Sequence, residues 1–76
     1  MLVVDDAPEF CQLIGDALTD AGYSVRTART VAAASSEMAT SMPDLVVLDL
    51  GLPDGDGLDV FRNIREHSNA YVLVVS

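Results

Sequence analysis

The sequence predicts an α/β fold built on a parallel β-sheet. Short apolar runs, typical of strands buried on both faces, alternate with segments in which apolar residues recur at helical spacing. The run Leu45–Leu48 is the clearest strand. It ends on a carboxylate, Asp49, before a turn that contains a proline and three glycines. The resulting order, β-α-β-α-β-α-β, implies parallel strands joined by right-handed crossovers.

The first strand is expected at Met1–Val4, and two carboxylates, Asp5 and Asp6, follow it directly. Pro8 suits the first turn of a helix, where a missing N–H costs nothing. Gly22 is a natural end for that helix. Six residues at helical spacing form its predicted apolar face: Phe10, Leu13, Ile14, Ala17, Leu18 and Ala21.

The second strand is expected at Tyr23–Arg26, where apolar and polar residues alternate as on a half-exposed edge strand. Residues 27–30 are interpreted as a connection. An alanine-rich helix follows at about Val31–Thr40, and its serines and threonine make it the weaker of the first two helices. Three of its residues are expected to face inward: Val31, Ala34 and Met38.

A third helix is expected from about Leu58 to His67, after the glycine-rich turn. Asp56 suits its N-cap, because an aspartate there can accept a hydrogen bond from the first turn. His67 suits its last turn, where a cation interacts favourably with the helix dipole. Tyr71–Val75 is the last apolar strand. The predicted core residues of the third helix are Val60, Phe61 and Ile64.

Composition excludes several classes of protein. The 76 residues form one domain at most, and 12 acidic residues against four arginines give a net charge of -8. So acidic a surface would be repelled by phosphate backbones, and no nucleic-acid partner is expected. No apolar run could span a membrane and no signal peptide is recognisable, so the expected location is the cytoplasm. Cys11, the single cysteine, lies off the predicted apolar stripe and is expected to form neither a disulfide nor a metal site.

Three carboxylates follow the carboxyl ends of two predicted strands: Asp5, Asp6 and Asp49. In open α/β sheets ligands bind outside these ends, so the three acids could share a pocket. Clustered like charges are costly unless a cation neutralises them, and oxygen ligands favour Mg²⁺. A carboxylate beside Mg²⁺ can also attack phosphorus to give an aspartyl phosphate. The alternative is a solvated acidic cap without a ligand.

Two segments carry a resemblance to a known family: LVVDD at Leu2–Asp6 and PDLVVLDLGLPDGDG at Pro43–Gly57. Together, and at this spacing, they resemble the receiver domain of two-component response regulators, and the likeness extends over residues 1–76. The resemblance implies a flavodoxin-like parallel sheet with strand order 2-1-3-4. It also implies a response-regulator module that accepts a phosphoryl group from a histidine kinase, and hence a phosphoacceptor domain at most rather than a conventional enzyme.

The same resemblance implies roles for individual residues. It makes Asp49 the phosphoacceptor in phosphorelay signalling. It makes Asp6, Asp49 and the backbone carbonyl of Gly51 direct Mg²⁺ ligands, with Asp5 acting through a water molecule. It places Ser76, at the end of the fourth strand, as the hydroxyl that moves toward the phosphoryl group on activation.

The sequence departs from the family pattern after the fourth strand. In the family a further helix, strand and helix follow, with a lysine that contacts the phosphoryl group, whereas these 76 residues contain no lysine. We therefore expect residues 1–76 to form a single partial receiver domain whose phosphorylation and switching are impaired. The alternative is a self-associating structural half-receiver without switching. It would be a homodimer formed through the edge strand Tyr71–Val75 or by exchange of elements between chains.

Two further interpretations are excluded by single positions. Asp54–Gly57 resembles the start of a calcium-binding loop, but the twelfth position, which should be glutamate, is Arg65. A phosphatase of the haloacid dehalogenase type would need a second aspartate two residues after its nucleophile, where this chain has Gly51. Neither function is therefore expected.

Overall fold

The computed structural model of the chain describes residues 1–75, which form four strands and three helices in the predicted alternating order. The first half contains β1 (Leu2–Val4), α1 (Pro8–Asp20), β2 (Arg26–Ala28) and α2 (Val31–Thr40). The second half contains β3 (Leu45–Asp49), α3 (Gly57–His67) and β4 (Tyr71–Val75). All elements except β2 lie close to their predicted positions.

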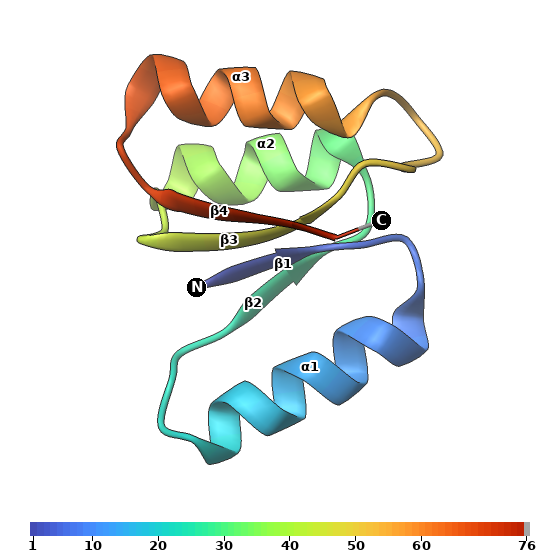
Figure 1. Cartoon of the computed structure of the whole chain (residues 1–76), viewed down its shortest axis with the longest axis vertical. Helices are drawn as coiled ribbons and strands as arrows, with labels where there is room; N and C mark the ends of the chain where they lie inside the picture. Colours follow the sequence, from blue (N-terminus) through green and yellow to red (C-terminus); the bar gives the residue numbers. More distant parts are fainter. Residues whose placement is uncertain (76) are drawn as a thin grey trace.

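The strands form one parallel sheet in the order β2-β1-β3-β4, which confirms the predicted fold class and strand order. Figure 1 shows α1 on one face of this sheet and α2 with α3 on the other. Because helices cover both faces, the central strands β1 and β3 need apolar side chains on both sides. Parallel pairing also brings the carboxyl ends of the strands to one edge of the sheet.

The sheet separates two hydrophobic clusters. Alternate residues of β1 point to opposite faces, so that Leu2 and Val4 join one cluster and Val3 joins the other. The smaller cluster, under α1, contains Val3, Cys11 and Val47. The larger cluster lies between the sheet and the helices α2 and α3. Its buried residues are Leu2, Val4, Ala28, Ala34, Met38, Val46, Leu48, Leu52, Val60, Ile64 and Ala70.

The second strand lies later in the chain than the sequence predicts. The alternation at Tyr23–Arg26 indicates a strand there, but β2 occupies Arg26–Ala28, part of which was expected to be a connection. Tyr23 instead caps the end of α1 from outside the helix, because its N–H donates to the carbonyl of Leu18 at 3.0 Å. Gly22, with φ of 96°, supplies the left-handed turn that makes this possible. The prediction is wrong because the chain is still leaving the helix at these residues.

The buried face of α1 also differs from the prediction. Cys11, predicted to lie off the apolar stripe, is only 6% exposed, and its Sγ donates to the carbonyl of Asp5 at 3.3 Å. Leu13, predicted to face the core, is 67% exposed. The two residues lie about 200° apart around the helix axis, so only one of them can face the sheet. Three predicted residues do pack beside Cys11: Phe10, Ile14 and Leu18.

The ends of α3 agree with the sequence. Asp56 is its N-cap, and the Asp56 side chain accepts a hydrogen bond from the N–H of Leu58 at 2.9 Å. His67 lies in the last turn, with its Nδ1 2.9 Å from the carbonyl oxygen of Asn63. Across residues 1–75, none of the helices combines the length and the apolar character needed to cross a membrane.

Candidate functional site

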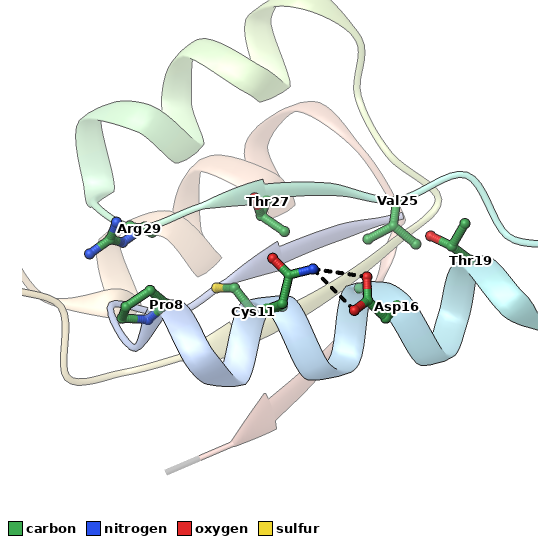
Figure 2. A pocket seen from close by; sticks show the side chains of 9 residues that line it. Pro8, Cys11, Asp16, Thr19, Val25, Thr27 and Arg29 are labelled. Atoms are coloured by element: carbon green, nitrogen blue, oxygen red, sulfur yellow. Dashed lines mark hydrogen bonds between the residues drawn. The ribbon is translucent and has the colours of Figure 1, made fainter.

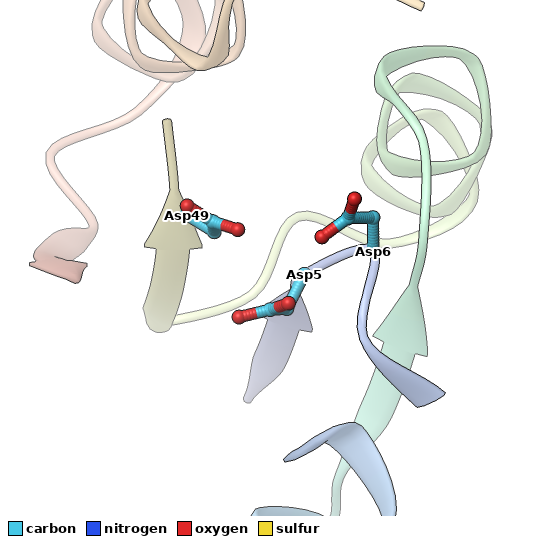
Figure 3. A group of neighbouring side chains, drawn as sticks. All are labelled: Asp5, Asp6 and Asp49. Atoms are coloured by element: carbon cyan, nitrogen blue, oxygen red, sulfur yellow. The ribbon is translucent and has the colours of Figure 1, made fainter. Parts of the chain in front are cut away.

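The structure brings the three candidate carboxylates together at the carboxyl edge of the sheet. The register of β1 and β3 pairs Val4 with Leu48, so Asp5 and Asp49 are the next residues on two adjacent strands. One carboxylate oxygen from each of Asp5, Asp6 and Asp49 lies within 4.8 Å of the other two. Figure 3 shows the three side chains gathered at the carboxyl ends of β1 and β3.

Backbone hydrogen bonds orient two of these carboxylates. Oδ1 of Asp5 accepts the N–H of Ala7 at 2.9 Å, and Oδ1 of Asp49 accepts the N–H of Gly51 at 3.1 Å. Each bond reaches two residues ahead and uses one oxygen of the carboxylate. Asp5 is 9% exposed, Asp49 is half-buried and Asp6 is exposed. The site therefore combines three acidic groups with two neutral backbone donors, an arrangement that attracts a cation.

The chemistry of this donor set fits Mg²⁺. All three groups offer carboxylate oxygens, which are the ligands that hard divalent cations prefer. Two oxygens that each lie about 2.1 Å from one ion can be at most about 4.2 Å apart. The carboxylate oxygens lie up to 4.8 Å apart. To share a cation, they would therefore have to move about half an ångström closer together or bind it through a bridging water.

A tight loop carries the chain from Asp49 to α3. The N–H of Gly57 donates to the carbonyl of Leu50 at 3.1 Å and closes the loop. A Cβ on Gly57 would lie 2.6 Å from the Cα of Leu50 and 2.7 Å from the carbonyl oxygen of Asp49, so only glycine permits this approach. Gly51, whose carbonyl is a candidate ligand, is an exposed residue of this loop. The loop therefore determines where the backbone around Asp49 lies.

Asp54 has no role in the sequence-based interpretation, yet both of its carboxylate oxygens form hydrogen bonds. Oδ1 accepts the N–H of Val31 at 2.7 Å, and Oδ2 accepts the N–H of Ala32 at 3.1 Å. These two bonds lower the pKa of Asp54, because they stabilise its ionised form. An aspartate before a glycine is an ordinary turn signal, so the local sequence does not indicate a contact with residues far earlier in the chain.

Two other residues were considered from the sequence. Ser76, the predicted switch hydroxyl, lies outside the described residues. His67 lies near the amino ends of the strands, opposite to Asp49, because α3 starts beside the carboxyl end of β3 and runs back toward the start of β4. The structure therefore does not bring His67 to the acidic site.

A separate hollow of about 370 Å³ lies between α1 and β2, with Cys11 and Arg29 among its lining residues (Figure 2). On its rim, Nε2 of Gln12 donates to both oxygens of Asp16 at 3.0 Å. Burial, reinforced by the charge of Asp5, raises the pKa of the Cys11 thiol, so the thiol is neutral near pH 7. This hollow therefore presents no activated nucleophile. Among residues 1–75, the acids at the strand ends are the only cluster suited to a metal ion.

Comparison with known proteins establishes the family. A family model of the response regulator receiver domain matches residues 1–76. The chain belongs to the response regulator receiver domain family. The resemblance carried by Leu2–Asp6 and Pro43–Gly57 is thereby confirmed, as is the flavodoxin-like topology that it implied.

Individual relatives agree with this assignment. The transcriptional regulatory protein KdpE from Mycobacterium tuberculosis is 45% identical over 76 residues, a match that covers all of this receiver and 34% of KdpE. The BeF3-activated receiver domain of RstA from Klebsiella pneumoniae is 30% identical with a TM-score of 0.87, over 96% of this chain and 62% of that one. A response regulator from Burkholderia pseudomallei, solved with a phosphorylated aspartic acid, calcium ion and citrate, is 27% identical with a TM-score of 0.90, over 96% and 44%. The chain thus spans about a third of the length of its curated relative.

Replacing Gly57 with alanine should destabilise this receiver by about 1–3 kcal/mol, because the added methyl group would overlap the backbone of Leu50 and Asp49. Gly15→Ala is the matched control. A Cβ at Gly15 meets nothing within 4 Å, and the change should stabilise α1 by about 0.5–1 kcal/mol. Urea denaturation of both variants measures these effects. Equal stability of Gly57→Ala and the wild-type chain would contradict the close approach.

Proposed function

We propose that this receiver accepts a phosphoryl group on Asp49, while Asp6, Asp49 and the backbone carbonyl of Gly51 bind Mg²⁺ and Asp5 acts through a water molecule. The observation that carries the proposal is the convergence of three carboxylates within 4.8 Å at the carboxyl ends of β1 and β3. Membership of the receiver family supports the same assignment. So does the Burkholderia pseudomallei structure, which was solved with a phosphorylated aspartic acid and a calcium ion.

Asp49 is the nucleophile of the proposed transfer. One of its oxygens attacks the donor phosphorus, so that a bond forms between this oxygen and phosphorus while the bond from phosphorus to the leaving group breaks. The hydrogen bond from the N–H of Gly51 to Oδ1 keeps the Asp49 side chain oriented during the attack. Bound Mg²⁺ supplies positive charge that offsets the negative charge of the transferring group. Asp5 and Asp6 hold that charge beside the acceptor.

The proposed partner is a histidine kinase. With a phosphohistidine as donor, whose other ring nitrogen carries a proton, the phosphorus–nitrogen bond breaks, its electron pair stays on the nitrogen and a neutral imidazole leaves. The chain corresponds to about a third of KdpE, a protein named as a transcriptional regulator, so the role proposed here is that of the receiver module in phosphorelay signalling. Ser76 is proposed, from the resemblance alone, as the hydroxyl that moves toward the phosphoryl group.

Mg²⁺ should raise the melting temperature of the chain, because an ion that binds only the folded state stabilises that state by mass action. Asp49→Asn should reduce this response. The same substitution should stabilise the metal-free chain, since it removes one of three like charges that lie within 4.8 Å. Thermal melts followed by circular dichroism, with and without millimolar Mg²⁺, measure both effects.

Asp20→Asn is the matched control for this experiment. It makes the same charge change at the exposed C-terminal end of α1, away from the carboxylate cluster. Its response to Mg²⁺ should equal that of the wild-type chain. Wild-type melts that are identical with and without millimolar Mg²⁺ would show that the carboxylates do not form a cation site.

Acetyl phosphate should phosphorylate Asp49 slowly and to well below one group per chain. These 76 residues contain no lysine that could place a positive charge against the phosphoryl oxygens. Intact-mass spectrometry should reveal a minor species that carries one added phosphoryl group. The species should require Mg²⁺ and should disappear on treatment with hydroxylamine, which cleaves acyl phosphates.

Asp49→Asn should abolish this species, whereas Asp44→Asn, immediately before β3 and at the other end of that strand, should not. Complete absence of the species at saturating Mg²⁺ would exclude Asp49 as a phosphoacceptor in the 76-residue chain. Stoichiometric modification would instead show that the missing lysine is not required, and would overturn the expected impairment.

A second property, self-association, is favoured by the exposure of β4. Within residues 1–75 this strand pairs with β3 alone, so its outer edge carries unpaired backbone N–H and C=O groups. Tyr71, Leu73 and Val74 are 79%, 58% and 47% exposed. An apolar strand with an open edge is a template for pairing. The isolated 76-residue chain is therefore proposed to form a homodimer, by antiparallel pairing of β4 or by exchange of elements.

Sedimentation of the 76-residue chain at micromolar concentration should reveal a dimer. Val74→Glu should weaken association, because it places a charge on the pairing strand. Leu13→Glu, which changes an equally apolar residue that is 67% exposed on α1, should leave association unchanged. A folded monomer, or a Val74→Glu dimer of unaltered affinity, would argue against pairing through β4.

A further inference from the structure

The loop that follows Asp49 is tied to α2 by a single side chain. Asp54 lies in this loop, and its two oxygens accept the N–H groups of Val31 and Ala32 at 2.7 and 3.1 Å. Within residues 1–75, these are the only hydrogen bonds that join residues 50–56 to an element other than β3 and α3. The contact spans 22 and 23 positions of sequence.

Asp54 also completes the N-terminus of α2. The first four N–H groups of a helix have no partner within the helix. Thr30, the N-cap, satisfies one of them, because its Oγ1 accepts the N–H of Ala33 at 3.0 Å, while its carbonyl accepts the first regular helical bond from the N–H of Ala34. Asp54 satisfies two more, those of Val31 and Ala32. Its charge also faces the positive end of the helix dipole, which strengthens the contact.

The loop lies close against α2 at this point. Gly55 follows Asp54, and a Cβ at Gly55 would lie 3.2 Å from Cγ2 of Val31, tighter than an ordinary contact. On the other side of Asp54, the side chain of Leu52 is 8% exposed and belongs to the larger hydrophobic cluster. Gly51 lies directly before Leu52. The loop is therefore anchored by one apolar and one polar side chain close to the candidate carbonyl ligand.

We propose that Asp54 is a positioning residue for the cation site: by clamping the loop to α2, it holds the backbone of Gly51 beside Asp49. This inference rests on the proposed function, because it concerns the same cation. Asp54 itself touches no ligand in this scheme. Its contribution is to restrict the loop before the ion arrives, so that less ordering is required when the ion binds.

Two variants break the hydrogen bonds between Asp54 and α2, one by removing the acceptors and one by removing a donor. Asp54→Ala deletes both acceptors. Val31→Pro deletes one donor while keeping the helix, because proline is favoured at the first helical position and Thr30, with φ -142° and ψ 164°, has the extended conformation that precedes proline. Val31→Ala keeps the N–H and is the control for the lost side chain. Asp20→Ala is the control for the lost charge.

Mg²⁺ is the probe, and the amide signals of Asp49 and Gly51 in NMR titrations give its affinity. Asp54→Ala should weaken Mg²⁺ binding by about tenfold, the lower end of the effect of removing supports around metal ligands. Val31→Pro should weaken it less, and adding Val31→Pro to Asp54→Ala should cause little further loss, since both changes break one contact. Val31→Ala and Asp20→Ala should bind as the wild-type chain does.

A purely structural role for Asp54 would lower stability without changing affinity. All titrations are therefore made at a temperature where circular dichroism shows each variant folded. The Gly51 amide signal should already be shifted in metal-free Asp54→Ala, and Asp54→Asn, which retains one carbonyl oxygen, should give intermediate affinity. If Asp54→Ala does not fold, Asp54→Asn and Val31→Pro provide the same comparison.

The outcomes separate this inference from the proposed function. Wild-type and Asp54→Ala chains that bind Mg²⁺ with equal affinity would overturn the positioning role and leave the cation site intact. A wild-type chain that does not bind Mg²⁺ would overturn the site itself, and the positioning role with it. Loss of affinity in Asp20→Ala equal to that in Asp54→Ala would assign the effect to net charge and would also overturn the inference.

Discussion

The fold and the site both depend on the parallel pairing of β1 with β3. This pair lies between helices on both faces. Five of its side chains have no exposed surface: Leu2, Val3, Val4, Val46 and Leu48. Burial of apolar surface at about 25 cal/mol per Å² is the main term that holds such a pair together. A carboxylate inside the pair would be buried without compensation. Acidic side chains are therefore excluded from the paired residues and occur only where the strands end. The register of β1 with β3 places those ends side by side.

The clustered carboxylates repel one another and so lower the stability of the metal-free fold. Its three acids lie within 4.8 Å of one another, and the N–H groups of Ala7 and Gly51 offset only part of their repulsion. The ion pairs found among residues 1–75 join Arg26 to Glu37 and Arg62 to Asp59, away from the cluster. Within residues 1–75 the three acids are therefore largely uncompensated by basic side chains. With the proposed cation bound, such a site would gain more free energy than a neutralised one, so lower stability without metal and affinity for metal would have one physical origin.

The sequence predicts the parts of this molecule that depend on local signals. Leu45–Leu48 is a strand buried on both faces, and Asp56 caps α3, because burial and capping are read from neighbouring residues. β2 could not be located in this way. Only Ala28 is buried in that strand, and its position follows from pairing with β1, a long-range condition. Cys11 and Leu13 exchange their expected roles because the rotation of α1 about its axis is set by the sheet beneath it. The contact of Asp54 with α2 is non-local for the same reason.

The loop between β3 and α3 shows how the site depends on these non-local contacts. Three different forces restrict its seven residues: steric exclusion at Gly57, apolar burial of Leu52 and the hydrogen bonds of Asp54. Ordering a free backbone costs about 1–2 kcal/mol per residue. If the cation had to order the loop, the lost conformational entropy would offset much of the free energy of binding. Because the three restraints act in the metal-free fold, the attraction between the carboxylates and a cation can instead appear as affinity. The tertiary structure thereby converts a common acidic motif into a site with defined geometry.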